Sequence, residues 1–159
     1  MRRIVILALS ALLVVAMAVP ALAAPKNKGT TYVAPSAITG SVLQGVTSPG
    51  SLGNMGAGFG IVGNMNKGII KHVGGLEITT TLGDVEIRNF WINTNNGTVS
   101  AYVVELDTRV TLFDLSGVSV DGNGDISATL LFNDTASNVI VGSSAITGDS
   151  AGSAFVDLP

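Results

Sequence analysis

Apolar and polar residues alternate over most of the second half of the chain, which is the period of a β-strand with one buried face. The alternation is clearest at 126–132, where Ile, Ala, Leu and Phe occupy every second position. It also runs through 76–82 and 85–88, on the two sides of a Gly83-Asp84 turn. These patterns predict antiparallel strands that are joined by short turns.

The alternation slips once, near the middle of the chain. Val85 and Ile87 would lie on one face of an ideal strand, whereas Phe90 and Ile92 would lie on the other. One extra residue near Asn89 would bring all these side chains to the same face. The sequence therefore predicts a β-bulge near Asn89.

A hairpin is expected next, because Asn96-Gly97 tolerates the positive φ angles of a tight turn, and the returning strand is expected at 98–106. A helical signal occurs at 134–141, where one or two turns would begin with Asp134 as the N-cap. Further short strands are expected at 110–113, 118–120, 144–147 and 153–158, with a turn at 148–152.

The number and length of these elements predict the fold class. Seven to nine short strands at regular spacing, with at most one short helix, indicate an all-β domain, either an antiparallel β-sandwich or a barrel-like domain. One stretch departs from the pattern. Residues 45–68 hold eight glycines, so we expect an irregular Gly-rich loop with one short strand near Phe59–Val62.

The first residues have the features of a signal peptide. Two arginines precede an apolar run from Ile4 to Val19, and Ala21-Leu22-Ala23 is the small-x-small pattern of a cleavage site. We expect a signal peptide at 1–23, a flexible leader at 24–36 and a single β domain at 37–159. No second apolar run of about 18 residues follows, so no transmembrane segment is expected after cleavage. The protein is then expected to be secreted or held at the cell envelope.

Charge and cysteine content narrow the range of partners. The chain has a formal net charge of −3, and loss of Arg2 and Arg3 would leave six basic residues against eleven acidic ones. Nucleic acid is not expected as a partner, because binding it requires clustered Lys and Arg. The chain has 47% apolar residues and no cysteine, so it can form a core but has no disulfide or thiolate metal site.

One motif suggests an enzyme. Ser150 lies in a Gly-x-Ser-x-Gly pattern, and His72 lies upstream of it, as in chymotrypsin-like serine hydrolases. Only seven residues follow Gly152, which is too few for a specificity pocket. We therefore interpret the motif as a glycine-bounded turn.

A second motif suggests a cation site. Asp121, Asn123 and Asp125 place oxygen atoms at the alternating positions of a calcium-binding loop. Ile126 and Phe132 occupy the places where such a loop has glycine and a bidentate glutamate. The motif is a weak calcium candidate, and a hairpin turn is the favoured interpretation.

His72 is the only histidine of the chain, which excludes a metal site with several histidines. With Lys67, Lys71 and Arg88 nearby, it lies in a basic region of an acidic chain and could act as an axial haem ligand. The alternative is that Lys71-His72 lies on an exposed strand edge or strand end, where charge prevents pairing with other chains.

Five short segments, at 69–76, 85–92, 97–101, 109–115 and 152–156, carry a resemblance. They resemble secreted actinobacterial β-rich proteins and, more distantly, the haem-transport-associated (HtaA) domain, in which a His-x-Gly-x-Leu segment precedes a strand pair of this type. The resemblance covers about residues 68–157. It implies that His72 is the haem-pocket histidine and that Tyr32 lies near the place of the ligand tyrosine. The tryptophan-glycine segment of the family has no counterpart around Tyr32.

We therefore expect an exported, non-enzymatic β domain, without a cofactor, that acts as a structural or binding module at the cell surface or outside the cell. The alternative is a haem-binding module of an iron-acquisition system that uses His72 and Tyr32. The third hypothesis is a serine hydrolase with Ser150 as its nucleophile.

Overall fold

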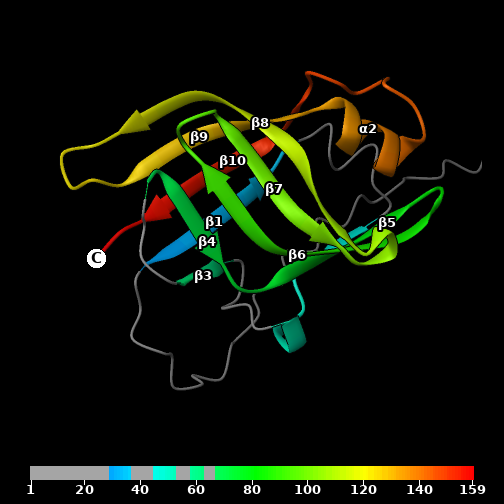
Figure 1. Ribbon diagram of the computed structural model, residues 1–159, viewed down its shortest axis with the longest axis horizontal. Coiled ribbons are helices and arrows are strands. Elements are labelled where there is room, and N and C mark those ends of the chain that lie inside the picture. The colour runs from blue at the N-terminus through cyan, green and yellow to red at the C-terminus, as the bar shows by residue number, and fades with distance from the viewer. Residues whose placement is uncertain (1–28, 37–44, 53–57, 63–66) are drawn as a thin grey trace, which may run out of the picture.

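The computed structural model describes residues 29–36, 45–52, 58–62 and 67–159 (Figure 1). The signal peptide predicted at 1–23 lies outside the described residues. Within the described part of the chain, no helix is both long enough and apolar enough to cross a membrane.

Eight antiparallel strands form a closed barrel (Figure 1). They are β1 (Thr30–Pro35), β3 (Gly58–Val62), β4 (Ile69–His72), β6 (Gly83–Asn93), β7 (Thr98–Val103), β8 (Thr108–Val120), β9 (Ile126–Phe132) and β10 (Ser150–Asp157). Their order around the barrel is β6-β4-β3-β1-β10-β9-β8-β7, and β7 pairs back onto β6. The predicted all-β class is confirmed, in its barrel form. A barrel of this size has room inside for side chains or for one small ligand.

Two further strands, β2 (Gly45–Thr47) and β5 (Gly75–Thr80), extend the sheet beyond the barrel. β5 pairs with the first half of β6 and β4 pairs with its last residues, so both strands share one edge of β6. Two glycines allow this switch. Gly74 has a φ of 100°, and a Cβ on Gly75 would clash with the carbonyl oxygen of Ile87.

The predicted β-bulge is confirmed in β6. Asn89 has a φ of 53°, and the pairing of β6 with β7 shifts register between Arg88 and Trp91. As a result, Phe90 and Ile92 are buried in the barrel on the same side as the residues before the bulge. Trp91, between these two buried residues, lies on the outer face of the barrel.

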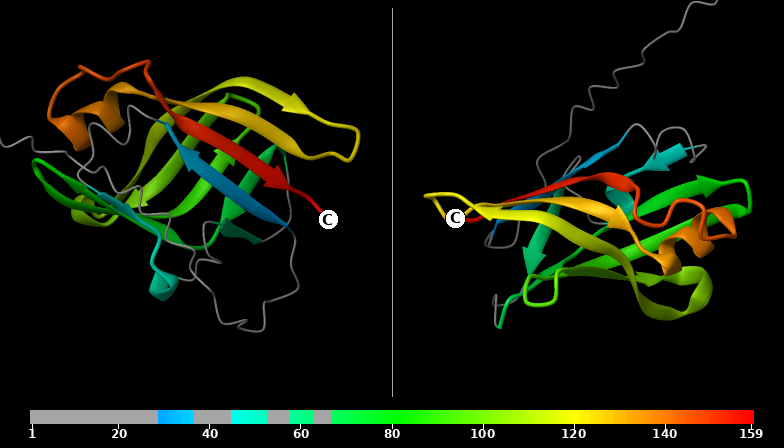
Figure 2. Two further views of the ribbon diagram at one scale, coloured as in Figure 1. Left: turned by 180° about the vertical axis from the view of Figure 1, so that it is seen from behind. Right: turned by 90° about the horizontal axis from the view of Figure 1, so that it is seen from above.

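In the part of the chain that the structure describes, one α-helix, α2 (Asp134–Val141), packs at one end of the barrel, away from the β8–β9 hairpin (Figure 2). Its N-cap is Asn133 and not the predicted Asp134. Asn133 has an extended backbone, and its Oδ1 accepts a hydrogen bond from the amide of Ala136 at 2.9 Å. Ala136 and Ile140 form the buried side of the helix.

Residues 30–35, which we expected at the end of a flexible leader, form β1 in the barrel wall. β1 pairs with β10 on one side and with β3 on the other, and Thr30 and Thr31 are buried. The leader prediction is wrong for these residues. The composition of the whole 24–36 stretch, which mixes proline, lysine and glycine with threonine, concealed a Thr-Thr-Tyr-Val run that suits a strand.

The Gly-rich stretch at 45–68 contains more regular structure than a loop. The short strand predicted near Phe59–Val62 is confirmed as β3. The prediction of an irregular loop is wrong for β2, which pairs with β5, and for a 3-10 helix, η1 (Gly50–Leu52). Glycine is compatible with a short strand when a neighbouring strand supplies the hydrogen bonds.

Two other expected strand segments are not strands. Residues 104–106 form a 3-10 helix, η2, which ends at Asp107 in the left-handed conformation with a φ of 49°. Residues 144–147 form turns, and the amide of Ile146 donates to Oγ of Ser137 at 3.2 Å. This bond ties the segment to α2 instead of to the sheet.

Candidate functional site

The barrel encloses an apolar cavity of about 250 Å³. Its walls include two pairs of aromatic rings. The ring centroids of Phe59 and Phe90 are 5.1 Å apart, and those of Phe113 and Phe132 are 5.8 Å apart. No charged side chain lines the cavity among the described residues, and the polar side chains there are those of Thr31, Thr47, Ser48 and His72.

The cavity extends toward the surface at one end of the barrel. Three of the residues that line it, Pro35, Val46 and Thr47, are exposed to solvent. They belong to the end of β1 and to β2, the strand that lies outside the barrel ring. The interior is therefore closest to solvent between these two strands.

His72, the last residue of β4, lines this cavity and is only 2% exposed. Its Nδ1 lies 3.0 Å from the carbonyl oxygen of Phe90, and its Nε2 lies 2.6 Å from Oγ1 of Thr31. Because a carbonyl oxygen can only accept, Nδ1 must carry the proton and donate it to Phe90. Nε2 then accepts a hydrogen bond from the Thr31 hydroxyl, so both ring nitrogens are paired.

This environment keeps His72 uncharged. Burial lowers the pKa of His72 to about 4, and the hydrogen bond to the Phe90 carbonyl offsets part of that effect. The imidazole is therefore neutral near pH 7. With no charged side chain among the described lining residues, the cavity wall is neutral as well.

Sheet register explains why Thr31 and His72 meet. On one side of β3, Thr31 pairs with Phe59, and on the other side Ile61 pairs with His72. Phe59 and Ile61 are both buried, so the paired residues point into the barrel from strands on either side of β3.

Sequence reasoning missed Thr31. Its only local signal was the β-branched run of β1, and the pairing depends on barrel topology.

The structure places Tyr32 on the other side of the barrel wall from His72. Tyr32 follows the inward-facing Thr31 and is 46% exposed. It pairs with Phe155 of β10, whose side chain is also exposed. Successive residues of a strand face opposite sides, so Tyr32 and His72 do not contribute to one site in this arrangement.

Ser150 is the first residue of β10, inside the predicted turn. Its backbone carbonyl accepts a hydrogen bond from Oγ of Ser36. β10 bulges between Ser150 and Gly152, and a Cβ on Gly152 would clash with the carbonyl oxygen of Ala34. Both ring nitrogens of His72 are bonded elsewhere, so the structure forms no Ser150–His72 pair.

The loop that contains Asp121, Asn123 and Asp125 is the hairpin turn between β8 and β9. Oδ1 of Asp121 accepts from the amides of Asn123 at 2.8 Å and Asp125 at 3.0 Å. Oδ1 of Asp125 accepts from the amide of Leu158 at 2.9 Å. Among the described residues, no group of three or more His, Cys, Asp or Glu could hold a metal ion.

The interpretation of Lys71-His72 as an exposed strand edge is wrong. The pair does lie at the end of β4, but β4 pairs with β3 and with β6, so neither side of it is free. Lys71 is exposed on the outer face of the barrel, whereas His72 lies inside. The basic and the imidazole side chains therefore face different environments.

Comparisons with known proteins show which solved structure has a similar fold. No protein-family description matches the sequence, and a search of curated proteins found no match. Among solved structures, the chain is similar to the C-terminal domain of HtaA from Corynebacterium glutamicum, with a TM-score of 0.56 and 16% sequence identity. The match covers 83% of this chain and 96% of that one. The distant resemblance to HtaA domains is therefore confirmed at the level of the fold.

Proposed function

We propose that this protein is an exported, non-enzymatic binding module that holds a small, neutral and largely apolar molecule inside its barrel. The observation that carries the proposal is the apolar cavity of about 250 Å³, in which Thr31 and His72 supply a buried polar pair. Apolar walls with a few placed polar groups are typical of small-molecule sites. Export is supported by the signal-peptide features of residues 1–23.

The volume of the cavity sets the size of the ligand. An apolar cavity of roughly 150 Å³ in another protein binds benzene, which has about six non-hydrogen atoms. On that scale, a cavity of about 250 Å³ has room for roughly ten non-hydrogen atoms. A short acyl or alkyl chain has this size.

The walls set the polarity of the ligand. A carboxylate in the cavity would lose its hydration without meeting a cation from the described lining residues, which costs several kcal/mol. A hydroxyl group would not have this cost. Because Thr31 donates its hydroxyl proton to His72, its oxygen retains lone pairs that can accept a hydrogen bond from an alcohol.

Straight-chain alcohols test the proposal. Each added methylene should tighten binding about fourfold, because its burial contributes about 0.8 kcal/mol. The gain should end at roughly ten non-hydrogen atoms, the length of 1-nonanol. Titration calorimetry with 1-pentanol to 1-dodecanol measures this dependence. At pH 8, nonanoate should bind at least tenfold more weakly than 1-nonanol.

A matched pair of variants tests the location. Ala154 is buried and lines the cavity, whereas its neighbour Ser153 is exposed on the outer face of β10. Ala154→Leu should fill part of the cavity and weaken 1-nonanol at least tenfold, and Ser153→Leu should leave the affinity unchanged. An affinity that keeps rising to 1-dodecanol, or equal binding by both variants, would contradict the proposal.

Haem is the second candidate, supported by the HtaA-like fold and by the Nδ1–H bond of His72 to a backbone carbonyl. Such a bond orients metal-bound histidines. However, Nε2 of His72 faces Thr31 in a cavity of about 250 Å³, below the roughly 300–1,000 Å³ of pockets for drug-sized ligands. The residues as placed do not fit a haem inside the barrel.

A hemin titration separates the two candidates. A saturable one-to-one Soret shift that His72→Ala removes would favour haem over the alcohol site. A shift that persists in His72→Ala but is lost in Tyr32→Phe would place haem on the outer face. Unsaturable or mutation-insensitive binding would leave the apolar-ligand proposal in place.

A further inference from the structure

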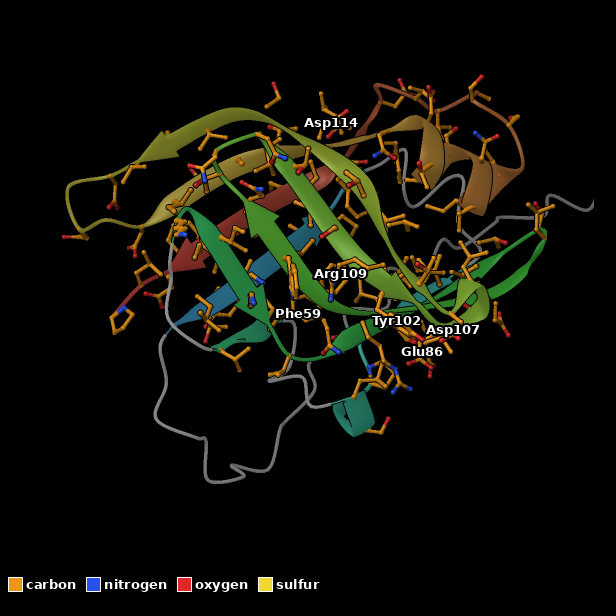
Figure 3. All side chains as sticks on the ribbon, viewed as in Figure 1. Phe59, Glu86, Tyr102, Asp107, Arg109 and Asp114 are labelled. Carbon is orange, nitrogen blue, oxygen red and sulfur yellow. The ribbon has the colours of Figure 1, made fainter. Side chains whose placement is uncertain are left out.

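The outer face of the barrel carries an arrangement that the interior cavity does not explain. Lys71 of β4 and Arg109 of β8 both lie over the ring of Trp91 in β6. Nζ of Lys71 is 4.4 Å from the ring centroid, and Cζ of Arg109 is 4.0 Å from it. Two cations therefore share one indole, and Figure 3 shows Arg109 on the side of the barrel formed by β6, β7 and β8.

Backbone contacts fix both cations on this face. Lys71 pairs directly with Trp91, and Trp91 pairs with Ser100 of β7. Nη1 of Arg109 donates to the carbonyl oxygen of Ser100 at 3.3 Å. Given their distances to the ring, the two charges are no more than 8.4 Å apart. Like charges at this separation repel each other, so holding them together has an electrostatic cost.

Neither of these two cations has an acidic partner among the described residues. All eleven acidic residues lie in the described part of the chain, together with only four basic ones. Within that part, the one ion pair joins Arg88 to Glu86, and no carboxylate pairs with Lys71 or Arg109. Protection of a sheet edge does not explain Lys71, because β4 is paired on both sides.

The neighbours of Trp91 indicate what kind of anion would fit. Lys71, Trp91, Ser100 and Thr111 lie in register across β4, β6, β7 and β8. This row spans about 14 Å at the usual strand spacing. It combines a cation, a partly exposed aromatic ring and two hydroxyl side chains. Carboxylates, the C–H groups of a pyranose ring and sugar hydroxyls are the matching groups.

We propose that this outer face binds an acidic saccharide whose carboxylates contact Lys71 and Arg109 and whose rings lie along the row from Trp91 to Thr111. The site is separate from the apolar cavity and does not depend on the function proposed for it. Its ligand would be a chain of a few sugar units, since the row of side chains spans about 14 Å.

Oligogalacturonates are a suitable probe, and their fully methyl-esterified forms are the matched neutral control. Trp91 is the only tryptophan of the chain, so its fluorescence reports binding at this face. We expect a saturable change in emission with the acidic oligomer, at least tenfold weaker binding of the ester, and loss of affinity in 0.5 M NaCl. Saturating 1-nonanol should leave the saccharide affinity unchanged.

The double variant Lys71→Gln/Arg109→Gln should weaken the oligogalacturonate at least tenfold. Arg88→Gln is the control, because Arg88 lies on the same strand as Trp91 but is paired with Glu86. It should change the affinity less than twofold. Equal binding of acid and ester, insensitivity to salt, full affinity in the double variant, or tighter binding of polyphosphate than of oligogalacturonate would each overturn the proposal. The salt and ester measurements need no variant, so they decide the matter even if the double variant does not fold.

Discussion

Nε2 of His72 lies 2.6 Å from Oγ1 of Thr31, a residue 41 positions earlier in the chain. The pair joins β4 to β1 inside the barrel, on either side of β3. It is the reason that a histidine can be buried in an apolar interior with both ring nitrogens bonded. Burial keeps the imidazole of this pair uncharged by lowering its pKa, and a neutral cavity wall favours a neutral ligand.

The stability of the protein should fall as the pH decreases from about 6.5 to about 4. In this range the unfolded chain binds a proton at His72 that the folded chain excludes, so acidification favours unfolding. The contribution of neutral His72 to stability is fully present above the unfolded pKa of 6.5. Because the folded pKa is about 4, acidification through this range should lower the free energy of unfolding by about 3 kcal/mol. Urea unfolding at pH 7, 5.5 and 4 measures the loss.

His72→Asn provides the control for this prediction, because it removes the titrating group while keeping a donor for the Phe90 carbonyl. Carboxylates contribute equally to both proteins, so the difference between the two pH profiles isolates His72. An NMR titration of the ring protons gives the same information without a variant. A midpoint near 6.5 in the folded protein would show that His72 is solvated.

Loss of the Thr31 hydroxyl should destabilise the barrel. In Thr31→Val the shape is nearly kept, but Nε2 of His72 loses its donor in a buried position. Leaving such an acceptor unpaired costs about 1–3 kcal/mol. Thr31→Ser keeps the hydroxyl and should be the more stable of the two in urea. Equal stability of the two variants would mean that water replaces the threonine.

Local patterns predicted those features that depend on neighbours in sequence. The strand at 126–132 was recognised by its alternation, and the bulge at Asn89 by the change of phase around it. Features set by distant strands were missed. The contact between Thr31 and His72 requires β1 and β4 to flank β3, and nothing within either segment encodes that order. For the same reason the sequence does not show that Tyr32 faces outward, away from His72.

Gly152 should be essential for the pairing of β10 with β1. It has a φ of 150°, and a Cβ there would clash with the carbonyl oxygen of Ala34. Gly152→Ala should lower the free energy of unfolding by about 1–3 kcal/mol. Gly122→Ala is the control, because a Cβ at Gly122 would meet no atom within 4 Å, and it should change stability by less than about 0.5 kcal/mol. Thermal unfolding of the two variants compares them directly.

Export should remove residues 1–23, so the mature chain should begin with Ala24. N-terminal sequencing of protein recovered from the medium or the cell envelope checks this cleavage site. Ala23→Leu should slow processing, because signal peptidase requires a small residue at that position. A mature protein that retains the apolar run from Ile4 to Val19 would contradict both the processing and the predicted location.

Ser150 should not behave as a nucleophile. An activated serine needs a base within hydrogen-bond reach, and both ring nitrogens of His72, the one histidine of the chain, are bonded to Thr31 and Phe90. Incubation with a fluorophosphonate probe should therefore leave the protein unlabelled, while a serine hydrolase added to the same sample is labelled as a positive control. Ser150→Ala should bind 1-nonanol as the parent protein does, since Ser150 does not line the cavity. Stoichiometric labelling that disappears in both Ser150→Ala and His72→Ala would show that the barrel opens to bring these residues together, and the proposal of a non-enzymatic module would then be wrong.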